Sequence, residues 1–149
     1  MPFIQVREVM KKSCRDHKKV AEFFDDLMDS VDDVKLKYIL SNMKDHEDKM
    51  AHCIQEYLKV KESPGLNTWL QYLPDMQEVS QLLDEDCDID EETLVQMIRD
   101  VQSTFIENYE KLSQVNLSDT VTDIFIDMKN LSSHECERRG WGKVQMDDF

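Results

Sequence analysis

The sequence predicts an all-α fold, an antiparallel four-helix bundle built from two repeated helical hairpins. Residues that form turns are scarce, with three Gly and three Pro in 149 residues, while 34% of the residues are charged. This composition is typical of long helices joined by few loops. Four segments carry apolar residues at helical spacing. The length suits one domain, so we assign residues 1–149 to a single bundle.

The first hairpin is predicted from two helices at about residues 5–31 and 33–60. Only the acidic pair Asp32-Asp33 separates them, so the two helices are expected to fold back antiparallel. Their stripes are Val6, Met10, Cys14, His17, Val20, Phe24, Leu27 and Val31, followed by Leu36, Ile39, Leu40, Met43, Glu47, Met50, Ile54 and Leu58.

A long connection is predicted at about residues 61–89. Pro64-Gly65 and Pro74 interrupt any helix there. Between them, residues 69–73 are expected to form one turn that caps an end of the bundle, and Val79 to Leu83 are expected to form a short helix. A connection of this length favours a crossover between two hairpins over a tight turn.

The second hairpin is predicted from helices at about residues 90–114 and 118–139, with a frayed tail at 143–149. Asp88 and Glu91 have the spacing of a capping box, and Ser118 is a suitable N-cap for the last helix. The stripes are Leu94, Met97, Ile98, Val101, Phe105, Tyr109 and Leu112, followed by Val121, Ile124, Phe125, Met128, Leu131, Glu135 and Arg138. We expect the methionines in these stripes to fill the core.

The charge of the chain excludes several classes of function. A net charge of −14 is unfavourable for binding nucleic acid or an anionic membrane surface.

The start of the chain lacks the apolar run of a signal peptide, and no stretch has the length of a transmembrane helix. Four cysteines without a zinc or disulfide spacing favour a reducing compartment. We therefore expect a cytoplasmic protein.

An alternating acidic run, Asp84-x-Asp86-x-Asp88, has the spacing with which a calcium loop begins. Such a loop requires Gly at its sixth position and Glu at its twelfth, which are Ile89 and Val95 in this chain. We interpret the run as an acidic loop that precedes a helix.

An internal repeat relates the two hairpins. The second and fourth helices match at an offset of 88 residues, where Asn42, His46 and Glu47 correspond to the identical Asn130, His134 and Glu135. The first and third helices match more loosely at an offset of 85, which pairs Phe24 with Tyr109 and Leu27 with Leu112. The repeat predicts that the two hairpins arose by duplication.

Two repeated hairpins joined by a long crossover resemble the ferritin-like superfamily, and in particular its rubrerythrin-type four-helix bundles. The resemblance implies a di-metal site at which a Glu from one helix of each hairpin and Glu-x-x-His from the other face inward. Glu47 and Glu135 match the second of these patterns, but Met50 and Arg138 stand where it has His. The remaining Glu positions would fall near Cys14 and Arg99. The di-metal site is therefore degenerate.

Two interpretations of these residues remain open. In the first, an altered site binds iron, manganese or zinc through the carboxylates and imidazoles of Glu47, Glu135, His46, His134 and His17. In the second, no metal binds, and the guanidinium of Arg138 bridges Glu47 and Glu135 in a structural polar network. The direction of Arg138 relative to the bundle interior distinguishes the two.

We expect the second interpretation, which makes the protein a non-enzymatic bundle without a cofactor. It would act through protein–protein contact or as a homodimer. The alternative is a metal-binding or oxidative-stress protein with an altered His/Glu site. Haem ligation by His17 and His134 is disfavoured, because the sequence has no run of small apolar residues that could line a haem cleft. Cys14 and Cys136 lie near the polar positions, where we expect buried apolar side chains rather than redox thiols.

Overall fold

The computed structural model describes residues 4–60, 65–115 and 118–139, and of residues 134–139 it describes the backbone alone. Four long helices carry almost all of the secondary structure, which confirms the all-helical class. They are α1 (Val6–Met28), α2 (Val34–Lys59), α3 (Glu91–Ser113) and α4 (Asp119–Arg139). The shorter elements are β1 (Ile4–Gln5), β2 (Trp69–Leu70) and the 3₁₀ helix η1 (Val79–Leu82). None of the described helices combines the length and apolar composition of a membrane span.

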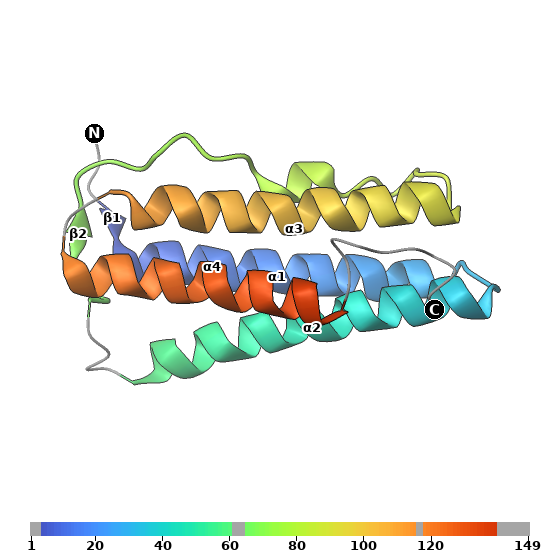
Figure 1. Cartoon of the computed structure of the whole chain (residues 1–149), viewed down its shortest axis with the longest axis horizontal. Coiled ribbons are helices and arrows are strands. Elements are labelled where there is room, and N and C mark those ends of the chain that lie inside the picture. Colours follow the sequence, from blue (N-terminus) through green and yellow to red (C-terminus); the bar gives the residue numbers. More distant parts are fainter. Residues whose placement is uncertain (1–3, 61–64, 116–117, 140–149) are drawn as a thin grey trace.

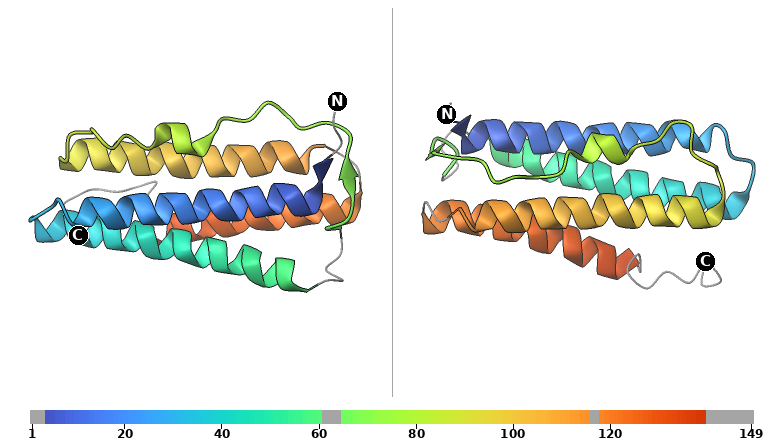
Figure 2. Two further views of the ribbon diagram at one scale, coloured as in Figure 1. Left: turned by 180° about the vertical axis from the view of Figure 1, so that it is seen from behind. Right: turned by 90° about the horizontal axis from the view of Figure 1, so that it is seen from above.

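The helices lie side by side in two hairpins (Figure 1). α1 and α2 run in opposite directions, as do α3 and α4, and the crossover between the hairpins runs back along the length of α3. Two further views show the same arrangement from behind and from above (Figure 2). The crossover thus returns the chain to the end of the molecule at which α2 begins.

Helix α1 ends three residues earlier than its apolar stripe predicts. Its last helical residue is Met28, and the amide of Val31 bonds to the carbonyl of Met28 in a tight turn. Val31 is nevertheless buried, because it folds onto the core from the link. The spacing of apolar residues does not distinguish the last turn of a helix from a following tight turn whose side chain packs on the same core.

Side chains at three helix starts accept hydrogen bonds from the first turn. Asp33 accepts from the amide of Leu36 at 3.1 Å, and Ser118 accepts from the amide of Val121 at 3.2 Å. The predicted N-cap Ser118 is therefore confirmed. The predicted capping box of Asp88 and Glu91 is wrong, since Asp90 caps α3 and accepts from the amide of Thr93 at 2.8 Å.

The predicted stripes form one continuous core. Met10, Phe24, Met43 and Phe125 are each at most 1% exposed. Burial of a side chain of this size stabilises the folded state by about 1.5–3 kcal/mol. The helices are therefore held together mainly by these stripes, and the methionines fill the core as expected. Other members of the same cluster are Val6, Val20, Ile39, Leu40, Met50, Ile54, Leu94, Ile98, Val101, Phe105, Leu112, Val121, Ile124 and Met128.

The crossover is packed onto the bundle rather than looped away from it. Ile4 pairs with Leu70 in an antiparallel two-stranded ladder, so the predicted turn at residues 69–73 is wrong. Leu66, Leu70 and Val79 are buried in the core, and the short helix predicted at Val79 is confirmed as η1. An extended strand replaces the turn because the start of the chain supplies a partner for it.

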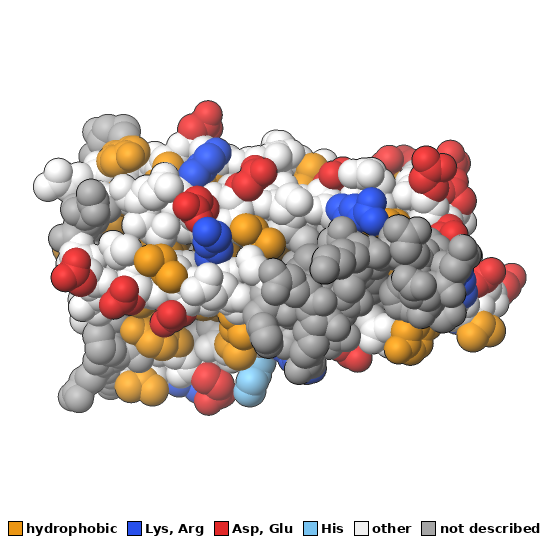
Figure 3. Space-filling view, viewed as in Figure 1, with side chains coloured by type: hydrophobic (Ala, Val, Ile, Leu, Met, Phe, Trp, Pro, Cys, Tyr) orange, Lys and Arg blue, Asp and Glu red, His pale blue; other side chains and the backbone are white. Residues whose placement is uncertain are grey.

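Acidic side chains are spread over the molecular surface and gather at the end where α3 begins (Figure 3). The acidic run predicted there lies in the loop before α3, where Asp84, Asp86 and Asp88 are all exposed. Asp84 Oδ1 accepts a hydrogen bond from the amide of Asp86 at 3.0 Å. The carboxylates of this loop are therefore solvated.

Candidate functional site: a buried polar network

A buried hydrogen bond between side chains joins the two helices of the first hairpin. His17 of α1 and Glu47 of α2 are both 0% exposed, and His17 Nδ1 bonds to Glu47 Oε2. A carboxylate has no proton to give, so we assign the proton of this bond to Nδ1. Both residues lie on the apolar stripes of their helices, which turns their polar atoms toward each other inside the core.

The imidazole of His17 is held on its other edge and on its face by α3. Its Nε2 lies 2.7 Å from the hydroxyl oxygen of Tyr109. The ring stacks on Phe105, with 3.8 Å between ring centroids and 14° between planes. Both nitrogens of His17 are therefore engaged, and its rotamer is fixed from three sides.

Gln102 of α3 completes the contacts of the carboxylate. Its Nε2 donates to Glu47 Oε1 at 3.0 Å and lies 3.4 Å from Met43 Sδ. Gln102 is 2% exposed, and its Oε1 has no hydrogen-bond partner in the part of the chain that is described. Each oxygen of Glu47 thus accepts one hydrogen bond from a different helix.

Tyr109 of α3 also belongs to the network, and its phenol stays protonated. Burial raises the pKa of its phenol above the usual value, and the charges of Glu47 and Asp16 add to the effect, against a hydrogen bond from Ser13. A phenol in this state exchanges hydrogen bonds but does not act as a base at neutral pH. The chain Glu47–His17–Tyr109–Ser13 therefore runs from the bundle centre to the surface of α1.

His46 is buried beside the His17–Glu47 pair rather than at the edge of its stripe. The side chain is 1% exposed, and its Nε2 lies 3.8 Å from Glu47 Oε1. That distance is too long for a hydrogen bond. The structure therefore gathers three of the five predicted metal ligands, His17, His46 and Glu47, in one buried region.

The remaining predicted site residues fall on the final turns of α4. The side chains of His134, Glu135 and Arg138 lie outside the described residues, as does the contact that would separate the two interpretations. Within the described part of the chain, no group of three His, Cys, Asp or Glu side chains is arranged to hold a metal ion.

Two members of the network, Gln102 and Tyr109, were missed from the sequence, whereas His17 was among the predicted site residues. The ferritin-like spacing points to Cys14 and Arg99, but the residues level with Glu47 are His17 and Gln102, one helical turn later. The 85-residue offset that pairs Phe24 with Tyr109 also pairs His17 with Gln102, so the repeat carries this signal.

Cys14 is a buried structural thiol, as expected. Its Sγ lies 3.5 Å from the carbonyl oxygen of Ala51. Burial raises the pKa of the thiol, which keeps it protonated and unreactive. Of the two roles considered from the sequence, a redox thiol and a core side chain, Cys14 therefore has the second. Cys136 lies outside the described side chains.

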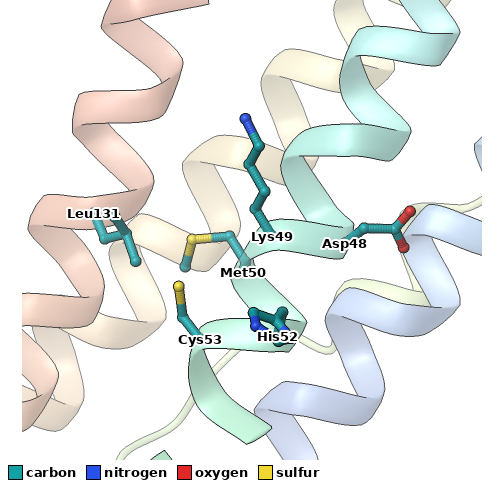
Figure 4. Close-up of a pocket in the computed structure, with 6 residues that line it drawn as sticks. All are labelled: Asp48, Lys49, Met50, His52, Cys53 and Leu131. Carbon is teal, nitrogen blue, oxygen red and sulfur yellow. The ribbon is translucent and has the colours of Figure 1, made fainter. Parts of the chain in front are cut away.

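A surface hollow of about 330 Å³ lies between α2 and α4, and its described lining contains no residue of the Glu47 network. In Figure 4, Met50 and Cys53 project toward Leu131 across this hollow, whereas Asp48 points to the opposite side of α2. The lining is mainly apolar, and the polar network does not open into it. We assign it no chemistry.

Comparisons with known proteins add no relative. No family model, no curated protein and no solved structure matches the chain.

Proposed function

We propose that the protein is a non-enzymatic, ferritin-like helical bundle in which a polar network occupies the place of the usual di-metal site. Two observations support the ferritin-like topology. The chain forms two antiparallel hairpins, and the crossover that joins them runs the length of the molecule (Figures 1 and 2). Polar residues also meet at the centre of the bundle, where that family binds its metals.

The bidentate engagement of Glu47 carries the proposal. Its Oε2 accepts from His17 and its Oε1 accepts from Gln102 at 3.0 Å, while His17 Nε2 is shared with Tyr109 at 2.7 Å. A metal ion would have to displace these partners to reach either residue. A buried carboxylate satisfied in this way needs no cation beyond its protein partners.

The proposed function of this bundle is to bind another protein or to form a homodimer. Large apolar side chains on the crossover support this part of the proposal. Trp69, Tyr72 and Leu73 are 56%, 52% and 40% exposed, within five consecutive positions. Aromatic residues of this kind are enriched at protein interfaces. Sedimentation equilibrium of the wild type and of Trp69→Ser/Tyr72→Ser tests this part, and a monomer at all concentrations would remove the homodimer.

A metal site remains the second candidate, and one observation favours it. His46 Nε2 lies 3.8 Å from Glu47 Oε1 and Gln102 Oε1 is buried next to the same carboxylate, so additional ligand atoms surround Glu47. Glu135 and His134 would complete the set in the repeat. Iron, manganese and zinc all suit such ligands.

Elemental analysis separates the two candidates. The protein is purified without a metal-affinity tag and analysed before and after loading with iron, manganese and zinc, next to Glu47→Gln. We expect no stoichiometric metal in either protein. One metal ion per chain that disappears in Glu47→Gln would support the metal site and overturn the structural network.

A further inference from the structure

A second hollow, of about 290 Å³, lies between α1 and α3 beneath the crossover. Residues 73–79 of the crossover form its outer wall. Two side chains of α3 hold that wall in place: Asn108 Nδ2 donates to the carbonyl of Gln77 at 2.9 Å, and Lys111 Nζ donates to the carbonyl of Asp75 at 2.8 Å. The hollow is therefore preformed, and its size suits a small molecule.

Part of the lining of this hollow is apolar. Val9 of α1 and Phe105 and Leu112 of α3 line it from the helices, and Met76 and Val79 line it from the crossover. These residues come from three segments that are far apart in sequence. They would accept the apolar body of a ligand about the size of a substituted benzene ring.

The lining also contains charged side chains, with carboxylates in excess. Of the described residues that line the hollow, Asp16, Asp75 and Glu78 are acidic and Lys12 alone is basic. Lys12 Nζ lies 2.8 Å from Asp16 Oδ2 and 2.8 Å from Glu78 Oε1. The two carboxylates therefore converge on one point with the spacing that an ammonium group requires.

Lys12 can leave that point at little cost. Its side chain is 49% exposed, and Glu78 is 39% exposed, whereas Asp16 is only 12% exposed. Ion pairs of a half-exposed lysine contribute little to stability, because water solvates the ammonium almost as well. A ligand that carries an ammonium group and also buries apolar surface would bind at this point more favourably than the side chain of Lys12.

Hydroxyl groups complete the lining where it meets the buried network. Ser13 and Tyr109 both line the hollow, and Tyr109 is held from behind by His17 Nε2 at 2.7 Å. They supply neutral hydrogen-bonding groups next to Asp16. The phenol does not compete for the position of a cation, because it carries no positive charge.

We propose that the hollow beneath the crossover binds a small organic ammonium ion with an apolar body. The ammonium replaces Lys12 Nζ between Asp16 and Glu78, and the apolar body packs against Phe105 and Val79. This site borders the Glu47 network at Phe105 and Tyr109, but the proposed ammonium contacts are with Asp16 and Glu78, which are not part of that network. Metal analysis and ligand binding therefore succeed or fail independently.

The probe is 2-phenylethylammonium, titrated into the full-length protein and followed by ¹H–¹⁵N NMR and calorimetry. Its matched controls are 3-phenylpropionate, which carries the opposite charge, and 2-phenylethanol, which carries none. We expect saturable shifts of the amides of Ser13, Val79 and Tyr109 with the ammonium probe and none with the carboxylate. Absence of saturable shifts, or equal binding of the carboxylate, overturns the proposal.

Variants with opposite expected effects sharpen the test. Asp16→Asn should weaken binding of the probe about tenfold by removing one of its two charges, and Lys12→Met should strengthen binding by removing the internal competitor. Lys11→Met is the matched control, because Lys11 pairs with Glu8 at 3.5 Å and does not line the hollow. If Asp16→Asn does not fold, Glu78→Gln on the crossover gives the same comparison. Unchanged or weaker binding in Lys12→Met overturns the proposed ammonium position.

Discussion

Gln102 Nε2 lies 3.0 Å from Glu47 Oε1, so an amide of α3 holds one oxygen of a carboxylate whose other oxygen is bound by His17 of α1. Three helices from both hairpins thus converge on one buried charge. A buried carboxylate is costly unless its partners are all in place. The network therefore constrains how the hairpins pack, in addition to any contribution to stability.

Removal of the carboxylate should be strongly destabilising. Glu47→Ala leaves His17 and Gln102 buried without their acceptor, and losses of this kind are about 3–5 kcal/mol in the free energy of unfolding. Glu8→Ala is the matched control, because Glu8 is 51% exposed and its pair with Lys11 at 3.5 Å lies in solvent. Urea denaturation measures both. Equal effects of the two substitutions would contradict a structural role for Glu47.

Tyr109 should make stability depend on pH in the alkaline range. The pKa of the folded-state phenol is raised above its ordinary value of 10.0, so above that pH the unfolded chain loses this proton while the native protein keeps it. The native state then binds more protons, and the free energy of unfolding falls by about 1.4 kcal/mol per pH unit from this group. The stabilisation is fully present below pH 10.0 and is lost as the pH rises.

Denaturation between pH 9 and 11 measures this slope, with Tyr109→Phe as the comparison. Phenylalanine has no proton to lose, so the variant should lack the contribution of Tyr109 while keeping that of every other group. Tyr72→Phe serves as the control, since Tyr72 is 52% exposed. A slope that is identical in the wild type and Tyr109→Phe would show that the phenol ionises freely.

The N-cap of α3 should be Asp90 and not Asp88. Asp90→Ala removes the acceptor of the Thr93 amide at 2.8 Å and should lower the free energy of unfolding by about 1 kcal/mol. Asp88→Ala changes a side chain of the same type two residues earlier and should have no comparable effect. Thermal unfolding of the two variants measures the difference, and a larger loss in Asp88→Ala would favour the capping box predicted from the sequence.

A side chain at Gly65 should destabilise the fold. Its φ of +81° is a left-handed conformation, and a Cβ there would lie 2.9 Å from Ile124 Cδ1. Gly65→Ala therefore combines backbone strain with overpacking and should cost about 2–3 kcal/mol. Gly65→Asn separates the two effects, because Asn adopts positive φ more readily but retains the clash. If both variants unfold like the wild type in urea, the crossover is not packed against α4 as described.

The positions of the helices could be predicted because the relevant signals are local. Apolar residues recur at helical spacing throughout the four helices, and Ser118 begins α4 as its type suggests. The core side chains followed from the same stripes, since a face that is apolar along its whole length has to be buried. Two local predictions were wrong. Asp90 rather than Asp88 caps α3, and residues 69–70 pair with β1 instead of forming a turn, because each short segment had more than one possible hydrogen-bond partner.

The polar network could be predicted only in part. The sequence by itself determined that Glu47 and His17 lie on apolar stripes and must find partners inside the bundle. Only the tertiary structure decided that these partners are each other, Gln102 and Tyr109, because contacts between α1, α2 and α3 depend on the axial level of each helix. The short link between α1 and α2 places His17 near the level of Glu47, but no local pattern sets the level of Gln102 and Tyr109 on α3. The packing of the two hairpins against each other sets it.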